Sequence, residues 1–260
     1  PRNSQNSGKG IYKSLDAGRT WQMMGLENTK TIHRIIVDPN NENVVYAAAL
    51  GSAWGPNADR GVFKTVDGGQ KWEKVLYVND STGCAELVMD PSNPNKMLAA
   101  MWEYHREPWF FTSGGKGSGL YMTVDGGKTW QQQSEKNGLP AGKLGRMGLA
   151  FSRSKPNVVY ALIESSATAF YRSDDGGFNW KKRAENDIGN RPFYYAEIFV
   201  DPQNENRVYN LWSTISYSED GAKSFTQLVS FSGVHPDHHA FWIDPNNPEI
   251  VYVGTGDPNI

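Results

Sequence analysis

Residues 65–72 read Thr-Val-Asp-Gly-Gly-Gln-Lys-Trp, and variants of this octapeptide occur five times along the chain. The other copies begin at Ser14, Thr123, Ser173 and Ser218, so their central aspartates lie 45 to 58 residues apart. A hydroxyl and a carboxylate two residues apart can accept hydrogen bonds from the backbone of one tight turn, glycine permits positive φ, and the tryptophan packs beneath. The octapeptide therefore predicts a turn between two strands, repeated five times.

The fifth copy departs from this pattern at two positions. At the fifth position of the octapeptide the other four copies have glycine, and this copy has Ala222. At the eighth position the others have tryptophan, and this copy has Phe225. Because alanine tolerates positive φ less well than glycine, we expect this turn to be the loosest of the five. If φ at Ala222 is positive, Ala222→Gly is expected to stabilise the protein by about 1 kcal/mol.

A second pattern alternates with the octapeptide. Apolar runs end in Asp-Pro at residues 38–39, 90–91, 201–202 and 244–245, and a second apolar segment follows each. Proline presets φ and aspartate can bond the turn backbone, so each Asp-Pro predicts a reversal between two strands. Together the two patterns predict four antiparallel strands per repeat, which is typical of β-propeller blades. We therefore predict an all-β fold, with one β-propeller domain of five repeats over residues 1–260.

The two ends of the sequence supply complementary halves of one blade. The chain opens at a third-strand segment, residues 11–14, and closes after a second-strand segment, residues 251–255. One interpretation is a ring of five blades that closes by pairing the N- and C-terminal strands. The alternative is a piece of a larger propeller, with further domains in a longer parent chain. Such a piece would leave two sheet edges unpaired, and exposed edges favour aggregation.

Composition excludes several classes of function. Of 260 residues, 26 are Lys or Arg and 28 are Asp or Glu, so the net charge of -2 argues against a nucleic-acid binder. No apolar run is long enough for a membrane-spanning helix. The sequence also shows no charged segment followed by an apolar run, so no signal peptide is expected on it. The single cysteine, Cys84, excludes an internal disulfide framework.

The repeated turn resembles the Asp box of BNR-repeat propellers. The stretches at 10–14, 49–56, 60–65 and 235–245 resemble in sequence bacterial proteins with a sortilin N-terminal-like domain. The resemblance covers nearly the whole chain, and it implies a propeller located outside the cell, whether secreted, periplasmic or on the cell surface. Because such turns recur in hydrolases, receptors and assembly factors, the resemblance does not choose among these functions.

The predicted strand directions place the long loops on one face of the blades, opposite the Asp-Pro and octapeptide turns. These loops are 51–60, 102–119, 189–195 and 232–239, and ligand sites generally lie on loops over a rigid scaffold. The mixture of charged and aromatic side chains there suits a polar ligand. The candidate ligand-binding residues are His33, Arg34, Trp54, Glu86, Trp102, Trp109, Arg146, Tyr195, Glu197, Asp237 and His239.

Three of the five histidines cluster with a carboxylate at His235, Asp237, His238 and His239. Imidazoles and a carboxylate can bind a transition metal, but neighbouring residues of a strand point to opposite sides. We therefore expect a structural or ligand-contact role and no metal site. The sequence contains no phosphate-binding loop, zinc-protease motif or nucleophile elbow, and no cofactor is expected.

The leading functional hypothesis is a noncatalytic recognition propeller that binds a peptide, protein or glycan at the long-loop face. The alternative is a secreted glycoside hydrolase of the Asp-box propeller type, related to xyloglucan-degrading enzymes, which needs two carboxylates across the scissile bond of a polysaccharide. Carboxylates are available on the long-loop face, but no spacing specifies a pair. They are Asp59, Glu86, Glu197 and Asp237.

Overall fold

A computed structural model of the protein describes residues 7–229 and 234–255. Its regular structure is all strand apart from one short 3-10 turn at Glu135–Asn137, so the predicted all-β class is confirmed. Within the described residues, no helix is both long and apolar enough to cross a membrane. The chain divides into two compact units, residues 1–89 with 93–132 and residues 90–92 with 133–260, which are taken in turn.

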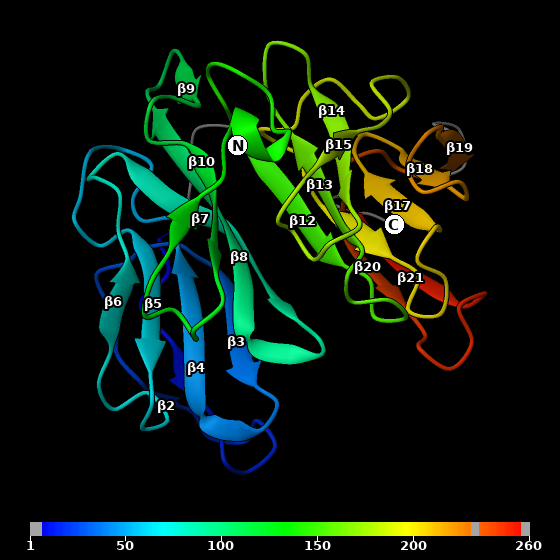
Figure 1. The fold of residues 1–260 in the computed structure, drawn as a ribbon. Coiled ribbons are helices and arrows are strands. Elements are labelled where there is room, and N and C mark those ends of the chain that lie inside the picture. The colour runs from blue at the N-terminus through cyan, green and yellow to red at the C-terminus, as the bar shows by residue number, and fades with distance from the viewer. Residues whose placement is uncertain (1–6, 230–233, 256–260) are drawn as a thin grey trace. The chain divides into compact units, whose positions relative to one another are not determined.

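The first unit contains two complete antiparallel sheets and a two-stranded one (Figure 1). The first complete sheet has the order β3-β4-β5-β6, and the second has the order β11-β10-β8-β7 with β9 added beside β8. The strands are β1 (Tyr12–Lys13), β2 (Gln22–Met23), β3 (Ile32–Asp38), β4 (Asn41–Ala49), β5 (Gly61–Thr65), β6 (Glu73–Leu76), β7 (Thr82–Asp90), β8 (Asn93–Arg106), β9 (Phe111–Ser113), β10 (Gly119–Thr123) and β11 (Gln131–Gln132).

The second unit repeats the pattern with sheets β12-β13-β14-β15, β16-β17-β18-β19 and β20-β21. Its strands are β12 (Met147–Phe151), β13 (Val159–Ile163), β14 (Ala169–Ser173), β15 (Lys181–Lys182), β16 (Ile198–Val200), β17 (Val208–Leu211), β18 (Ile215–Ser218), β19 (Thr226–Val229), β20 (His238–Ile243) and β21 (Val251–Thr255). The predicted four-stranded antiparallel blade of a β-propeller is therefore confirmed.

The closing blade stays a prediction. Among the described residues, β1–β2 and β20–β21 form separate two-stranded sheets, and no strand pair joins one to the other. The segments 1–6 and 256–260, which the closure hypothesis also uses, lie outside the described residues.

The octapeptide turns form the hydrogen bonds expected from their residue types. In the copy that follows β10, Thr123 Oγ1 donates to Asp125 Oδ1 at 2.8 Å and accepts from the Gly127 amide at 3.0 Å. The same Asp125 carboxylate accepts the backbone amide and the hydroxyl of Thr129. These bonds from Thr129 and Thr123 lower the pKa of Asp125 to about 2.

Positive φ angles occur where the turn requires them. Gly126 and Gly127 have φ of 72° and 83°, and Ala222 adopts 64° at the position equivalent to Gly127. The premise about Ala222 is therefore confirmed. Its side chain is fully buried in a cluster that includes Phe170 and Phe225, which the sequence pattern did not reveal.

The tryptophans that end these turns pack less uniformly than predicted. Trp180 is buried, and the indole N–H of Trp72 donates to the Met24 carbonyl of the preceding sheet at 2.6 Å. The prediction was wrong for Trp21, which is exposed and donates to Gly18 of its own turn at 3.0 Å. Trp21 belongs to the two-stranded sheet, which has no earlier sheet in the described chain on which this ring can pack.

The first complete sheet also holds the turn of the second. The Tyr46 hydroxyl and the Lys64 ammonium, from β4 and β5, donate to the Gly126 carbonyl at 2.9 and 2.8 Å. Between these sheets lies an apolar cluster built from Leu87, Met97 and other buried side chains of β4, β7 and β8. The apolar cluster and the two polar bonds fix the second complete sheet against the first, and so they position the loops at the opposite end of the strands.

Candidate functional site

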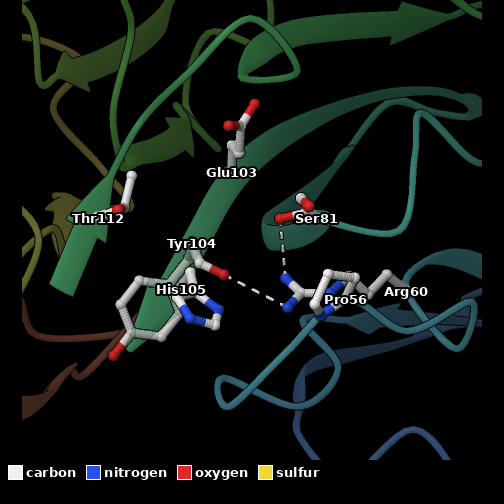
Figure 2. A pocket seen from close by; sticks show the side chains of 7 residues that line it. All are labelled: Pro56, Arg60, Ser81, Glu103, Tyr104, His105 and Thr112. Atoms are coloured by element: carbon white, nitrogen blue, oxygen red, sulfur yellow. Dashed lines mark hydrogen bonds between the residues drawn. The ribbon is translucent and has the colours of Figure 1, made fainter. Parts of the chain in front are cut away.

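A cavity of about 370 Å³ lies in the first unit, among its long loops (Figure 2). Its walls come from the 51–60 loop, from the start of β7 and from the hairpin of β8 and β9. The lining residues are Pro56, Arg60, Ser81, Glu103, Tyr104, His105 and Thr112. The volume is within the range of about 300–1,000 Å³ that is common for small-molecule sites.

Strand alternation places an acid and a histidine in this cavity. Strand β8 runs for 14 residues, and in its last part Trp102, Tyr104 and Arg106 are buried whereas the residues between them are partly exposed. Glu103 and His105 therefore share the face of β8 that borders the cavity.

A glycine-rich segment, residues 114–119, holds Glu103 in place. The Glu103 carboxylate accepts the Gly117 amide at 2.9 Å, and a Cβ atom added at Gly115 would overlap that carboxylate. A Cβ atom at Gly117 would overlap the Thr82 hydroxyl on the other side of the segment. Only glycine lets the backbone pass between Glu103 and Thr82, so this segment fixes where the acid stands.

Arg60 links the segments that form the cavity walls. Its guanidinium is fully buried and donates to the carbonyls of Ser81 at 3.0 Å, Ser52 at 2.6 Å, and Gly55 and Tyr104 at 3.3 Å (Figure 2). Burial lowers the pKa of Arg60 from its usual value, and nearby Asp80 partly offsets that effect. Four carbonyl acceptors from three chain segments make this side chain a structural link between the 51–60 loop, β7 and β8.

His105 has a carboxylate partner on the same strand. His105 Nε2 lies 2.7 Å from Glu107 Oε1, and both side chains are about one-third exposed. Alternate Cα atoms of a strand are roughly 6.6 Å apart, so the Cα atoms of Glu103 and His105 are spaced by about that distance. The cavity thus has an acid and a carboxylate-bound histidine on the same face of one strand, which are the residue types of general acid and base catalysis.

The sequence interpretation missed Glu103 and His105, although both belong to the predicted loop 102–119. Two signals were available: the alternation Glu-x-His-x-Glu over residues 103–107, and the glycine-rich segment 114–119. This segment has glycine at 114, 115, 117 and 119, which marks a close approach of the backbone to neighbouring side chains.

The predicted charged residues of the first unit pair with one another rather than line the cavity. Arg34 Nε and Nη2 donate to the Glu86 carboxylate at 2.7 and 3.0 Å, and His33 Nε2 lies 4.0 Å from it. Glu86 is nearly buried, and the bidentate guanidinium bond neutralises it. This pairing argues against Glu86 as a free acid.

The predicted aromatic residues differ in exposure. Trp109 is 78% exposed at the β8–β9 turn, and Trp54 is exposed on the 51–60 loop. Trp102 is only 4% exposed, stacks on Tyr104 with ring centroids 4.2 Å apart, and donates to Ser113 Oγ at 3.0 Å. Trp102 therefore supports the hairpin and has no free ring face for a ligand, because strand alternation turns it away from Glu103.

The predicted residues of the second unit form two separate groups. Arg146 donates to Glu197 at 2.9 Å and to the carbonyls of Phe193 and Tyr194. The Tyr195 hydroxyl donates to Asp237, and its ring stacks on His239 at 5.2 Å. Burial and the contact with Asp237 raise the pKa of Tyr195.

The histidine cluster divides as strand alternation predicts. His238 is buried and His239 is exposed, and burial lowers the pKa of His238. Within the described chain, no group of three or more His, Cys, Asp or Glu side chains is arranged to hold a metal ion.

Comparisons with known proteins extend over most of the chain. Xyloglucanase Xgh74A of Acetivibrio thermocellus is 24% identical over 273 residues, covering 87% of this chain and 29% of that protein. A probable oligoxyloglucan-reducing end-specific xyloglucanase of Neosartorya fischeri is 23% identical and covers 95% of this chain and 34% of that protein. The chain thus spans about a third of the length of these curated relatives.

Comparison with solved structures shows a similar fold over most of the chain. An ancestral GH74 enzyme superposes with a TM-score of 0.68 at 18% identity, covering 95% of this chain and 32% of that one. The family model of Sortilin-Vps10, described as sortilin, neurotensin receptor 3, matches residues 9–162, which is more than half of the chain. This match confirms the sortilin part of the expected resemblance, and the chain belongs to the Sortilin-Vps10 family.

Proposed function

We propose that this chain is part of a propeller of the glycoside hydrolase type that acts on a polysaccharide outside the cell, with xyloglucan as the first substrate to test. The observation that carries the proposal is the Glu103 carboxylate, held by glycines in a cavity beside a carboxylate-bound histidine. The relatives that are xyloglucanases support the same choice. This function is the alternative of the sequence interpretation, now preferred to the noncatalytic one.

The chemistry assigns one step to each group. Glu103 acts as the general acid and gives a proton to the glycosidic oxygen as the bond from that oxygen to the anomeric carbon breaks. Glu107 accepts a hydrogen bond from the Nε2–H group of His105, which leaves Nδ1 unprotonated, and Nδ1 takes one proton from the water that attacks the anomeric carbon. Attack by water on the face opposite the leaving group would give inversion at the anomeric centre.

The aromatic residues that remain exposed suit the same substrate class. Trp54 and Trp109 stand on the two loops that border the cavity. Indole rings stack on the apolar faces of sugars, so each provides a surface for a unit of a chain that extends beyond the cavity.

The test is the release of reducing ends from xyloglucan by the purified chain. Glu103→Gln should abolish release while leaving the melting temperature nearly unchanged, because Gln keeps an acceptor for the Gly117 amide. Glu73→Gln, on exposed β6 outside the cavity, is the matched control and should retain full activity. Equal activity of the Glu103→Gln variant and the wild type would refute the assignment.

The second candidate is noncatalytic recognition. It is favoured by the pairing of Glu86 with Arg34 and of Glu197 with Arg146, which leaves fewer free carboxylates than a hydrolase usually has. Affinity electrophoresis in gels that contain xyloglucan distinguishes the two functions. Retardation of the wild type without any release of reducing ends would select recognition of a glycan over its hydrolysis.

A further inference from the structure

A tyrosine fills the same place at two junctions between one sheet and the turn of the next. At the first junction, the Tyr46 hydroxyl donates to the Gly126 carbonyl at 2.9 Å, and Tyr46 is only 2% exposed. At the other, in the second unit, the Tyr160 hydroxyl donates to the Glu205 carbonyl at 2.7 Å, and Tyr160 is fully buried. The two units thus use one residue type for the same kind of contact.

Each tyrosine lies directly opposite a cation on the next strand of its own sheet. Tyr46 on β4 pairs in register with Lys64 on β5, and Tyr160 on β13 pairs with Arg172 on β14. The charged groups lie over the tyrosine rings, 5.2 and 5.5 Å from the ring centroids. The register of these antiparallel strands therefore determines where the tyrosine stands.

The turn at Gly68 has the same surroundings except for the tyrosine. A Cβ atom added at Gly126 would lie 3.1 Å from an asparagine oxygen, 3.7 Å from Lys64 Nζ and 3.5 Å from the Tyr46 hydroxyl oxygen. A Cβ atom added at Gly68 would likewise lie 3.1 Å from an asparagine oxygen and 3.7 Å from Lys13 Nζ. No tyrosine of the described residues lies within 4 Å of that position.

A hollow of about 170 Å³ lies among the groups that would surround the missing tyrosine. It is lined by Lys13, Leu15, Gln22, Met24, Asn43, Asp67, Gly68 and Gln70. A cavity of about 150 Å³ can hold a benzene ring, so the hollow is large enough for a phenol, and the flexible Met24 side chain can adapt to it. Lys13 belongs to β1, which among the described strands pairs only with β2. A strand added to the other edge of β1 would bring a tyrosine opposite Lys13.

We propose that β1 and this hollow bind an extended peptide segment of another molecule, which adds to β1 as an antiparallel strand with a tyrosine opposite Lys13. Backbone hydrogen bonds hold the segment on the strand edge, and the tyrosine hydroxyl donates to the Gly68 carbonyl, as at the first junction. The segment has the sequence class of residues 43–47 and 157–161, which both read Asn-Val-Val-Tyr-Ala. The edge and the hollow are open in the described structure, which favours a segment of another molecule. The proposal does not depend on the proposed hydrolysis.

The test uses a fluorescein-labelled peptide that contains Asn-Val-Val-Tyr-Ala between serines, with binding to the whole chain measured by fluorescence anisotropy. Phenylalanine in place of the peptide tyrosine should weaken binding about fivefold, because one hydrogen bond is lost. Alanine at that position should weaken binding by at least about tenfold, because the hollow then stays unfilled. N-methylation of the peptide amides that would face β1 should abolish binding, because strand addition needs these donors.

Variants of the protein test the same contacts from the other side. Gln22→Trp places a large side chain in the hollow from β2 and should abolish binding, and Lys13→Met should weaken binding about fivefold. Lys71→Met is the matched control, because this exposed lysine belongs to the same turn as Gly68 but does not line the hollow. Its binding should equal that of the wild type. Circular dichroism checks that each variant is folded.

Three results would overturn the proposal directly: no binding of the tyrosine peptide to the wild type, equal binding of the alanine peptide, or full binding to both hollow variants. The protein also has an exposed tyrosine in a similar sequence, Ile-Val-Tyr at 250–252, which supplies a further arm. Peptide binding that appears only in Tyr252→Thr would mean that this chain's own tyrosine takes the hollow. Self-association in sedimentation that Tyr252→Thr abolishes would mean that a second copy supplies it. Either result overturns the assignment to another molecule.

Discussion

Ala222 allows the backbone and packing contributions to one turn to be separated. At φ of 64°, replacing alanine by glycine removes backbone strain worth about 1 kcal/mol. The same change deletes a fully buried methyl group beside Phe170 and Phe225, which costs about 0.8 kcal/mol. The two terms nearly cancel, so Ala222→Gly should change the free energy of unfolding by less than about 0.5 kcal/mol. The 1 kcal/mol gain expected from the sequence omits the buried methyl group.

The equivalent turn after β10 supplies the matched experiment. A Cβ atom added at Gly127 would lie 3.5 Å from the Tyr46 ring, which is an ordinary contact, while φ is 83°. Only the backbone strain remains, so Gly127→Ala should destabilise the protein by about 1 kcal/mol.

Urea unfolding of the wild type and both variants measures these differences in the free energy of unfolding, with the same dependence on urea concentration (the m value) expected for all three proteins. A gain of 1 kcal/mol or more from Ala222→Gly would show that the buried methyl contributes nothing. No loss from Gly127→Ala would show that positive φ is not costly in this turn. Either result would refute the reasoning.

Three other predictions concern the cavity and the turns. Gly115→Ala should displace the Glu103 carboxylate and reduce the release of reducing ends by at least about tenfold, with circular dichroism unchanged. Arg60→Met should lower the free energy of unfolding by about 3 kcal/mol in urea titrations, because several buried carbonyls lose their donor, and Arg60→Lys should recover part of the loss. The carboxyl pKa values of Asp16 and Asp125 are lowered to about 2 from 3.8, so their stabilisation is complete above pH 4 and is lost as pH falls through 2. Urea midpoints between pH 5 and pH 2 should show this fall, and Asp125→Asn should reduce it.

The repeated turns made most of the fold predictable, because their chemistry is local. A hydroxyl, a carboxylate and glycines within eight residues determine the hydrogen bonds of one turn, as in Thr123 to Thr129, and the spacing between copies determines the strand count. The packing of each tryptophan was less predictable, because it depends on the preceding sheet. Trp72 has such a sheet and bonds to it, whereas Trp21 has none among the described residues.

The candidate site was harder to predict because it depends on contacts between distant segments. Glu103 is positioned by Gly117, and Arg60 reaches carbonyls as far along the chain as Tyr104. Alternation along β8 decides that Glu103 borders the cavity while Trp102 turns into the hairpin, and the sequence interpretation weighed the aromatic residues without that alternation.

The bond from one sheet to the turn of the next has a consequence for building artificial arrays from this protein. Lys64 stands three residues before the aspartate of its own turn, and it ends on the Gly126 carbonyl of the following one. In the second unit Arg172 occupies the same position and packs against Gly221 of its following turn. A tandem array copied from a single repeat with Lys or Arg at that position would therefore carry a matching donor and acceptor at every junction. An array copied from the repeat with Met122 there would lack the donor at every junction, and its modules would have only apolar packing to set their orientation.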